Sequence, residues 1–537
     1  LDKELTEIEN GFSYVKRIYD SSEETFYLTA TALIYEVKNY SGNILLDLDF
    51  RQMYNFDDTN RLYILKQKGD IIIISYPKHK KFFAIKGVND FNKIDSWEKR
   101  FYPYDQLRGT KSEFYVYRAI NIICNKNLKA YISMSDSEKD AIHNVESAAA
   151  NEHTLKQVHE IKFKQNKKNT LAKTAAINSL ESLRMNIGKG ENHVDGVFAG
   201  LPWFFQIWSR DELISLKAYM LKGDLNFVKK RLFAYLNSID ETGRIPNRLP
   251  HSDLSSADSI GWLFKRIFDF INILEKKHEL KKYLSKEELQ IIKHKLHFSI
   301  EEHMTRYIKD YIVHNGVKET WVDTDVENQD GRPGACIEIQ ALFLGFFKLM
   351  EKLCLHLNLT YFGYRELEKS FLNKIKQEFY KDGALLDRLG SETQRPNLFI
   401  AYYVYPELLK KHEWETAFNK AIRNLWLDWG GLSSIEKNHP LYKQNYTGHN
   451  NLSYHRGDSW YWINNLAAIC LADLNMKKYH HFIDNIYHAS EKDLLFSGFI
   501  GHSSELSSAS NQKSEGCLAQ AWSVATFLEL AEKLKKS

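Results

Sequence analysis

Two hydrophobic patterns divide this chain of 537 residues, and the change between them near residue 136 limits what it can fold into. From residue 11 to about residue 134, short runs rich in β-branched and aromatic residues, such as FYLTATALIYEV and IIIISY, are separated by turn-forming groups such as NYSGN and KQKGD. Several runs alternate apolar and polar residues, as half-buried strands do. We therefore expect residues 1–135 to form an antiparallel β-sandwich of two sheets.

Beyond residue 136 the strand-like alternation ends and apolar residues recur at helical spacing. Residues 136–173 open with the capping signal DSE before helix-forming residues, which predicts a linker helix region. The rest, residues 174–537, has helical spacing near residues 174–186, 210–222, 224–238, 257–277, 285–312, 336–357, 362–379, 397–410, 412–426, 458–474, 476–490 and 514–535. About twelve helices fit six pairs closed into a ring, so we expect an all-α (α/α)6 toroid with loops at its two rims.

Charge and cysteine usage exclude several classes of function. Lys and Arg number 73 and Asp and Glu number 69, and a net charge of +4 gives no case for nucleic acid or an anionic membrane as the main partner. The first residues, LDKELTEIEN, do not resemble a signal peptide, and no apolar run is long enough to span a membrane. Five widely spaced cysteines without a CxxC pair suit a reducing compartment, so we expect a cytoplasmic protein, with its oligomeric state open.

Five stretches of the helical part combine carboxylates with Trp, Arg and Asn: residues 200–216, 243–264, 319–342, 445–466 and 498–528. Aromatic rings stack on the C–H faces of a sugar, while charged and amide groups bind its hydroxyls. A glycosidic bond is usually cleaved by two carboxylates. No GxGxxG, P-loop, HExxH or GxSxG motif supports a nucleotide, zinc or serine-hydrolase site. The stretches therefore favour a carbohydrate-binding cleft.

Local structure offers a second interpretation of single residues in these stretches. Arg210 and Asp211 also fit a surface pair at the start of a helix. Asp258, in SSAD, fits a helix cap better than a binding residue when it is considered alone.

Metal binding is the rival interpretation of the acidic stretch, because Asp323, Asp325 and Glu327 alternate. A calcium-binding helix–loop–helix motif requires Gly at its sixth position and Glu at its twelfth, where this chain has Asn328 and Gly334. We therefore expect neither a metal ion nor an organic cofactor.

The order of these stretches resembles the amylo-α-1,6-glucosidase domain of glycogen debranching enzymes, from about residue 186 to the end of the chain. AGLPWFFQIWSRD resembles the family's AGYPWF–WGRD, and GRIPNR resembles GLIPNR. TWVDT followed by IEIQALF resembles TWMDA followed by VEINALW, and RPNLFIA resembles RPNQ with LFA. YHRGDSWYW resembles YHQGTVWPW, and GCLAQAWSVA is present intact. The departures, SRD for GRD and DSWYW for TVWPW, lie around the expected subsites.

This resemblance implies an inverting α-glucosidase of the glucoamylase-like toroid group, acting on glycogen or α-glucan oligosaccharides. The general acid maps to Asp323 and the general base to Glu505, with Glu515 as a competitor. Asp323 would need a raised pKa, and the two carboxyl groups should lie about 6.5–9.5 Å apart.

The predicted substrate-binding residues come from the same stretches: Trp203, Trp208, Arg210, Asp211, Asn247, Asp258, Trp262, Trp321, Glu338, Arg395, His455, Arg456, Trp460 and Trp522. Two alternatives stay open at this point. One is a toroid glycosidase for another α-glucoside, such as trehalose or glucosylglycerate, and the other is a non-catalytic carbohydrate-binding toroid.

Overall fold

The computed structural model describes residues 4–11, 14–51, 55, 61–157, 169–187, 194–249 and 255–535. It divides the chain into two compact units, Leu1–Thr170 and Leu171–Ser537. The expected linker region, residues 136–173, is shared between the two units, and its residues 158–168 lie outside the described part.

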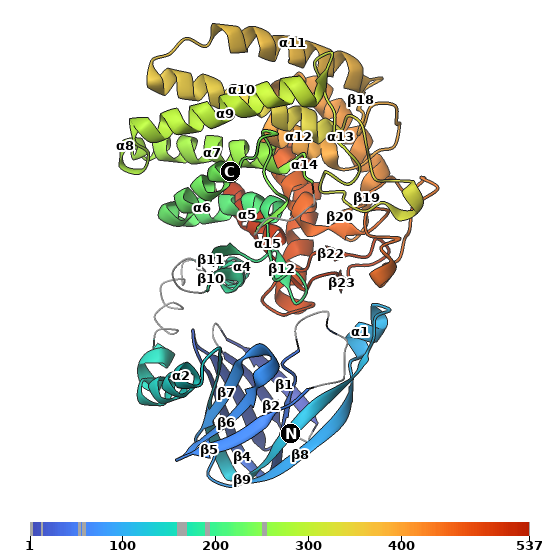
Figure 1. The fold of residues 1–537 in the computed structure, drawn as a ribbon. Coiled ribbons are helices and arrows are strands. Elements are labelled where there is room, and N and C mark those ends of the chain that lie inside the picture. The colour runs from blue at the N-terminus through green and yellow to red at the C-terminus, as the bar shows by residue number, and fades with distance from the viewer. Residues whose placement is uncertain are drawn as a thin grey trace. The chain divides into compact units, whose positions relative to one another are not determined.

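The first unit contains an antiparallel sheet (Figure 1), in the strand order β1-β2-β3-β4-β9-β7-β6-β5, with β8 paired to β9. The strands in the described residues are β1 (Leu5–Asn10), β2 (Tyr14–Tyr19), β3 (Ser22–Leu28), β4 (Leu33–Leu48), β5 (Ile64–Lys68), β6 (Ile71–Tyr76), β7 (Lys81–Lys86), β8 (Phe91–Phe101) and β9 (Glu113–Ser135). The predicted antiparallel β-region is confirmed. Hydrogen bonding joins its strands into one sheet, because β9 pairs with β4 on one edge and with both β7 and β8 on the other.

Both faces of this sheet are covered, and the strand β6 is accordingly apolar along its length. Ile72 and Ile74 belong to a core on one face, whereas Ile71 and Ile73 pack on the other face against the helix α2 (Glu138–Ala150). Alternate residues of a strand point to opposite faces, so a strand buried on both sides is apolar throughout. The helix expected as a linker therefore packs on the sheet of the first unit.

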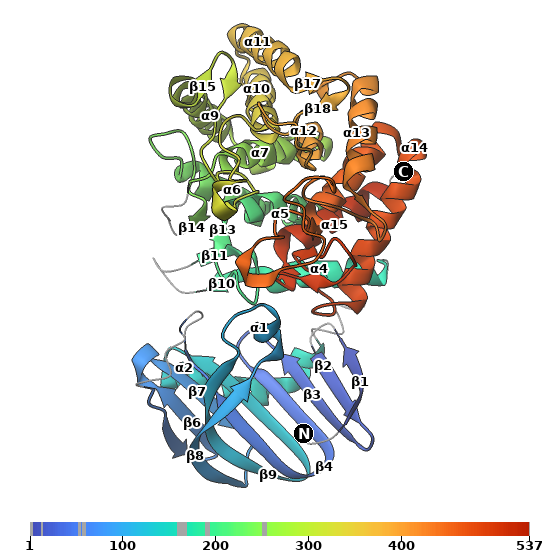
Figure 2. The ribbon, with the colours of Figure 1, turned by 90° about the vertical axis from the view of Figure 1, so that its right-hand side faces the viewer.

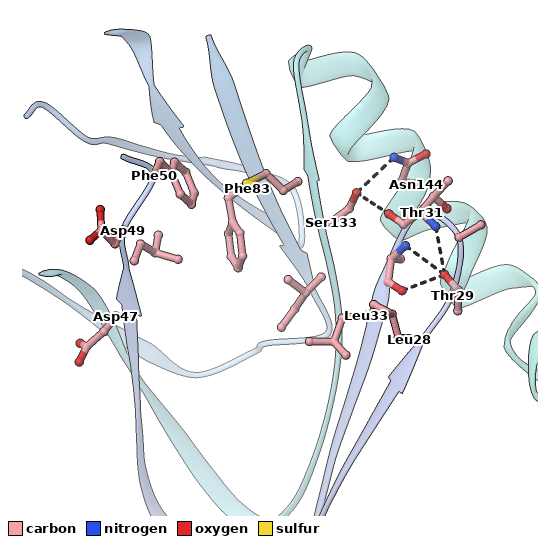
Figure 3. A pocket seen from close by; sticks show the side chains of 15 residues that line it. Leu28, Thr29, Thr31, Leu33, Asp47, Asp49, Phe50, Phe83, Ser133 and Asn144 are labelled. Atoms are coloured by element: carbon pink, nitrogen blue, oxygen red, sulfur yellow. Dashed lines mark hydrogen bonds between the residues drawn. The ribbon is translucent and has the colours of Figure 1, made fainter. Parts of the chain in front are cut away.

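A cavity of about 590 Å³ lies in this unit, between Asp47, Asp49 and Phe50 on one side and Thr29, Thr31, Ser133 and Asn144 on the other (Figure 3). Its polar side chains include several that are paired with other protein groups. Ser133 donates to the carbonyl of Thr31 and accepts from Asn144, and Asp47 is bound by Arg118.

In the second unit, six described helices contact one another in a closed cycle: α5 (Ser209–Lys222), α7 (Ser259–Lys276), α10 (Ile337–Leu357), α12 (Asn397–Val404), α14 (Tyr461–Phe496) and α15 (Ala521–Leu534). The other long helices, at the periphery of this unit in Figure 2, are α4 (Leu171–Leu183), α6 (Leu225–Asn237), α9 (Lys286–Arg306), α11 (Phe362–Phe379) and α13 (Lys411–Leu425). The inner helix α10 is buried on nearly all sides, whereas the peripheral helix α11 buries a single stripe. This difference is expected, because an inner helix is surrounded by protein and a peripheral helix has one face toward solvent.

The two segments predicted near residues 458–474 and 476–490 are one helix, α14, interrupted at Asn475, whose φ of −166° and ψ of 83° are not helical. The residues before this kink contact inner helices, since Cys470 donates to the carbonyl of Phe399. The residues after it contact the peripheral helix α13, since Tyr479 donates to Asn419. The second half of α14 therefore serves as a further peripheral helix.

The polar and aromatic stretches directly precede the inner helices. Short strands there include β13 (Ile207–Trp208) before α5, β21 (Ser459–Trp460) before α14 and β24 (Ala519–Gln520) before α15. None of the helices in the described part of the chain combines the length and the apolar character that a membrane span requires.

Candidate active site

Three acidic side chains surround Arg210 at the start of α5. Its Nε donates to Asp258 Oδ2 at 2.6 Å, and its Nη1 donates to Asp323 Oδ2 at 3.5 Å. Asp211 follows Arg210 in the chain and accepts from Gln520 at 3.1 Å. Arg210 is only 2% exposed, and its Nη2 has no partner within the described residues. Because buried guanidinium groups are normally saturated, this Nη2 is available to a ligand.

The helix-cap interpretation of Asp258 is wrong. Asp258 does precede α7, but its side chain makes no capping bond. Ser256 Oγ instead accepts the N–H of Ser259 at 3.2 Å, and also donates to Asp258 Oδ1. The Asp258 carboxylate is used to bind buried Arg210, which is a stronger, charge-assisted interaction.

The pKa of Asp323 is raised to about 6, mainly by burial. The positive charge of Arg210 lowers this pKa, and the negative charge of Asp258 raises it. The side chain keeps 34% of its surface exposed, so it remains accessible. A carboxyl group with a pKa near the working pH can hold a proton and also release it, as a general acid must.

A buried network positions the segment that carries Asp323. Trp321, two residues earlier, donates from Nε1 to Asn397 Oδ1 at 2.6 Å. Asn397 donates to Asp387 Oδ1 at 2.7 Å, and Arg332 donates to the same oxygen at 2.9 Å. Buried networks of charged and amide groups with their partners present are rigid. The backbone at Asp323 is therefore held from α12 and from its own loop.

Three predicted substrate-binding residues are used inside the protein instead. Glu338 is 1% exposed and accepts from Arg332 at 2.6 and 3.0 Å. Arg395 donates to two backbone carbonyls, and Arg456 binds both oxygens of Asp330 at 2.6 and 2.9 Å. Because these charged groups are buried and already paired, the structure does not support direct sugar contacts for them. They fix the loops around the site.

Glu505 is 3% exposed and lies directly before β22 (Leu506–Ser507). Its Oε1 accepts from the hydroxyl of Tyr454, and its Oε2 accepts from the backbone N–H of Cys517 at 2.9 Å. A Cβ at Gly516 would lie 2.3 Å from Glu505 Oε2, and Gly516 has a φ of +67°. Both features require glycine, so the backbone here is shaped around the Glu505 carboxylate.

The charges of Asp323 and Glu505 both raise the pKa values of Asp211 and Tyr454. Burial raises the pKa of Asp211 to about 8 against the charge of Arg210, and the charges of Glu505 and Asp323 both raise it further. Burial also raises the pKa of Tyr454 well above its usual value, and the same two carboxylates again contribute. Two consecutive residues also connect them, because Tyr454 donates to Glu505 and the Nδ1 of His455 lies 2.8 Å from Thr324, the residue after Asp323. Both carboxylates therefore belong to one cluster.

The competitor Glu515 lies in β23 (Ser514–Glu515), paired with β22, and its carboxylate binds Lys513 at 2.8 Å. Glu505, and not Glu515, has the bond from Tyr454 and the interaction with Asp211. These contacts favour Glu505 as the second functional carboxylate.

A cluster of indole rings lies next to these carboxylates. It contains Trp262, Trp321, Trp460, Trp462 and Trp522, each no more than 4% exposed. The rings of Trp462 and Trp522 stack with centroids 4.9 Å apart, and neither Nε1 has a partner within the described residues. Trp262 is 1% exposed and packs on Trp462 and Arg266, so it supports the core, and this packing does not support the substrate contact that we predicted for it.

His455 connects this cluster to the Asp323 loop. Its ring is stacked on Trp460 at 5.0 Å, and its Nδ1 is 2.8 Å from Thr324 Oγ1. Burial and the nearby Arg395 hold the pKa of His455 well below its usual value, so the imidazole is neutral. Its Nε2 has no partner in the described structure, which leaves it open to a hydroxyl group.

Three predicted residues lie near the start of α5. Trp203 and Trp208 are half-buried, and Trp208 donates to Gln206 at 3.4 Å. Asn247 is 3% exposed, and its carbonyl accepts the N–H of Ser209 at 2.9 Å. The Oδ1 of Asn247 has no partner within the described residues. Trp208 and Asn247 therefore lie beside the start of α5, where Arg210 is located.

Sequence analysis missed Tyr454, which holds Glu505. It directly precedes His455 in the YHRGDSW stretch, and this position could have indicated that Tyr454 belongs to the site. Its bond to a carboxylate 51 positions later could not be read from local spacing.

In the acidic loop after Asp323, a carboxylate binds backbone N–H groups of the same loop. Asp325 Oδ1 accepts from the N–H groups of Asp330 and Gly331 at 3.2 and 3.0 Å. Within the described residues, no group of three or more His, Cys, Asp or Glu side chains could hold a metal ion.

Comparisons with known proteins relate this chain to a family. The family described as amylo-alpha-1,6-glucosidase matches residues 126–529. No curated protein matches the chain. A bacterial glucoamylase complexed with acarbose has a TM-score of 0.67 at 10% identity, over 96% of this chain and 82% of its own.

Two structures from Thermus thermophilus match 67% of this chain and 99% of their own length. One is an uncharacterized conserved protein, with a TM-score of 0.52 at 11% identity. The other is a GH63 mannosylglycerate hydrolase in complex with glucose, with a TM-score of 0.50 at 11% identity. At such identities the likeness shows a shared fold.

Proposed function

The chain belongs to the amylo-α-1,6-glucosidase family and is a glycoside hydrolase, and we propose that it releases glucose from α-1,6-linked, and also α-1,4-linked, glycogen-type oligosaccharides with inversion at the anomeric carbon. Its partner is then glycogen or another α-glucan, and we propose a cytoplasmic location, in line with its cysteine usage.

The fold supports this proposal. The closed cycle of inner helices, with peripheral helices around it, fits an (α/α)6 toroid in the second unit. For the first unit we propose a sandwich that is folded from one continuous sheet, since β9 pairs with β8 along its first half and with β7 at its last residues, Tyr131 to Ser135.

In the proposed reaction, protonated Asp323 gives its proton to the glycosidic oxygen while the bond from that oxygen to the anomeric carbon breaks. Ionised Glu505 takes a proton from a water molecule, whose oxygen attacks the anomeric carbon from the opposite face. The products are β-glucose and the shortened glucan. The observation that carries the proposal is that two carboxylates, one with a pKa raised to about 6 and one fixed by Tyr454 and Cys517, share one cluster.

Buried polar atoms without partners are suited to bind the glucose hydroxyls. Arg210 Nη2 and His455 Nε2 are such atoms among the described residues. Asp211, with a pKa raised to about 8, is mostly protonated at pH 7 and can donate a hydrogen bond from a carboxyl group. Bound sugar hydroxyls would satisfy these groups, whose burial is otherwise costly.

The test is a product assay on a phosphorylase-limit dextrin, with the anomers followed by NMR from the first turnovers. We expect β-glucose to appear first and then to mutarotate. Initial release of α-glucose would refute inversion, and absence of glucose would refute hydrolysis of this substrate. A parallel screen with isomaltose, maltose and trehalose decides the substrate class, since a preference for trehalose would contradict the glycogen-type assignment.

A further inference from the structure

A second cavity, of about 520 Å³, lies in the helical unit, and no residue of the candidate active site lines it. It lies beside β19 (Trp426–Leu427), which follows α13, and beside the turn of the β22–β23 hairpin; these elements are labelled in Figure 1. We call it the hairpin pocket. It is lined by three aromatic residues and several polar ones, including Trp426, Trp429, Tyr442, Asp428, Gln444 and Asn511.

The aromatic side chains of the hairpin pocket are held in place but only half-buried. Trp426 packs edge-on against Phe482, with ring centroids 4.8 Å apart. Trp429 donates from Nε1 to the carbonyl of Ala509 at 3.3 Å. Tyr442 is half-buried as well. Partly exposed, fixed aromatic rings offer apolar faces to the C–H groups of a pyranose at little entropic cost.

Three polar side chains of the hairpin pocket are unpaired in the described part of the chain, whereas those of Lys437 and Gln512 donate to backbone carbonyls. Asp428, Gln444 and Asn511 are exposed, and within the described residues their side chains make no hydrogen bond or ion pair. The cavity of the first unit differs, because Ser133 and Asp47 are paired with protein groups there. Free carboxylate and amide groups beside aromatic rings match a ligand with an apolar face and a rim of hydroxyls, which is the chemistry of a sugar.

The hairpin pocket is connected to the general base through one hairpin. Glu505 directly precedes β22, and β22 pairs with β23 through Ser507 and Ser514. The turn between these strands lines the pocket, and its Ser510 N–H donates to the carbonyl of Gln444 at 2.8 Å. Ser510 is five positions after Glu505, so their Cα atoms lie at most about 18 Å apart. One extended oligosaccharide or one branched polymer can therefore occupy both places.

We infer that the hairpin pocket is a second carbohydrate-binding site, which holds a non-reacting α-glucan segment while another chain end is hydrolysed. The choice of α-glucan as ligand rests on the proposed function. Occupation of both sites by one polymer makes binding at the second site intramolecular, which raises the apparent affinity for long or branched substrates and not for short ones.

The first test measures binding of maltohexaose by titration calorimetry to the Asp323→Asn variant, in which we expect turnover to be at least about a hundredfold slower. Asp428→Ala with Gln444→Ala should remove one class of site or weaken it at least tenfold. These side chains are exposed, so folding is not at risk. The matched control is Asp484→Ala with Gln377→Ala, exposed residues of the same types on α14 and α11, and it should bind as the parent does. Unchanged isotherms in the pocket variant would overturn the inference.

The second test compares kcat/KM on a phosphorylase-limit dextrin with kcat/KM on isomaltose. In the pocket variant the first value should fall about tenfold, while the second stays within twofold of the parent. Equal changes on both substrates would overturn the inference. If the parent released no glucose at all, the proposed function would fail, and the calorimetric comparison would still decide the binding site.

Discussion

Replacing Asp323 by Asn should stabilise the helical unit in neutral solution while it removes activity. Burial raises the pKa of Asp323 from 3.8 to about 6, against the charge of Arg210. A shift of about 2 units corresponds to about 3 kcal/mol of preference for the protonated form. Because 34% of the side chain is exposed, solvent screening reduces this to about 2 kcal/mol.

Proton linkage determines at which pH the raised pKa of Asp323 stabilises the fold. The pKa of Asp323 is higher in the folded than in the unfolded chain, so its protonated form stabilises the fold in acid. This stabilisation is lost as the pH rises from about 4 through about 6. Asn stays neutral throughout, so it avoids the loss. The free-energy gain should be about 2 kcal/mol at pH 8 and less than a quarter of that at pH 4.

Scanning calorimetry at the two pH values measures this difference. For a unit of more than 250 residues, 1 kcal/mol corresponds to about 1–2 °C, so the variant should melt about 2–4 °C above the parent at pH 8. Asp484→Asn, an exposed carboxylate on α14, is the control and should show no change. A lower Tm at pH 8, or an equal change at both pH values, would refute the electrostatic account of Asp323.

Three further outcomes follow from the site. The kcat/KM of the enzyme should fall as the pH rises through about 6. Asp258→Asn should move this fall to lower pH, because the charge of Asp258 raises the pKa of Asp323. A fall that moves to higher pH would contradict this account. Gly516→Ala places a methyl group 2.3 Å from Glu505 Oε2, so kcat should fall at least tenfold, and an unchanged kcat would show that this fit is unimportant. Glu338→Gln breaks a buried ion pair, so the free energy of unfolding should fall by about 3 kcal/mol with KM unchanged, whereas a raised KM would indicate sugar contact.

Much of the fold could be predicted because periodicity is a local property. The strands of the first unit and the long helices of the second follow from spacing alone, as α10 and α11 do. Boundaries set by tertiary contacts could not be found in this way. The two segments near residues 458–474 and 476–490 look separate in sequence, and whether the chain continues through Asn475 depends on what each half packs against.

The stretches that form the candidate site could be predicted from the sequence, but the role of each residue in them could not. Arg210 and Asp323 lie in stretches that combine charged residues with Trp, and the role expected of Asp323 came from the family resemblance. Glu338 has the same local appearance, yet its partners are Arg332 and the network of Asp387, which only the folded chain brings together. A capping residue and an ion-pair partner also look alike in sequence, as Asp258 shows.

The proton-donor role of Asp323 is tested most directly by the activity of Asp323→Asn on two substrates. An α-1,6-linked glucoside needs a proton on its leaving oxygen, whereas α-glucosyl fluoride releases fluoride without one. We expect kcat/KM of the variant to fall about 10²–10⁴-fold on the glucoside and less than about tenfold on the fluoride. Equal losses on both substrates, or full activity on the glucoside, would contradict the assignment of Asp323 as the general acid.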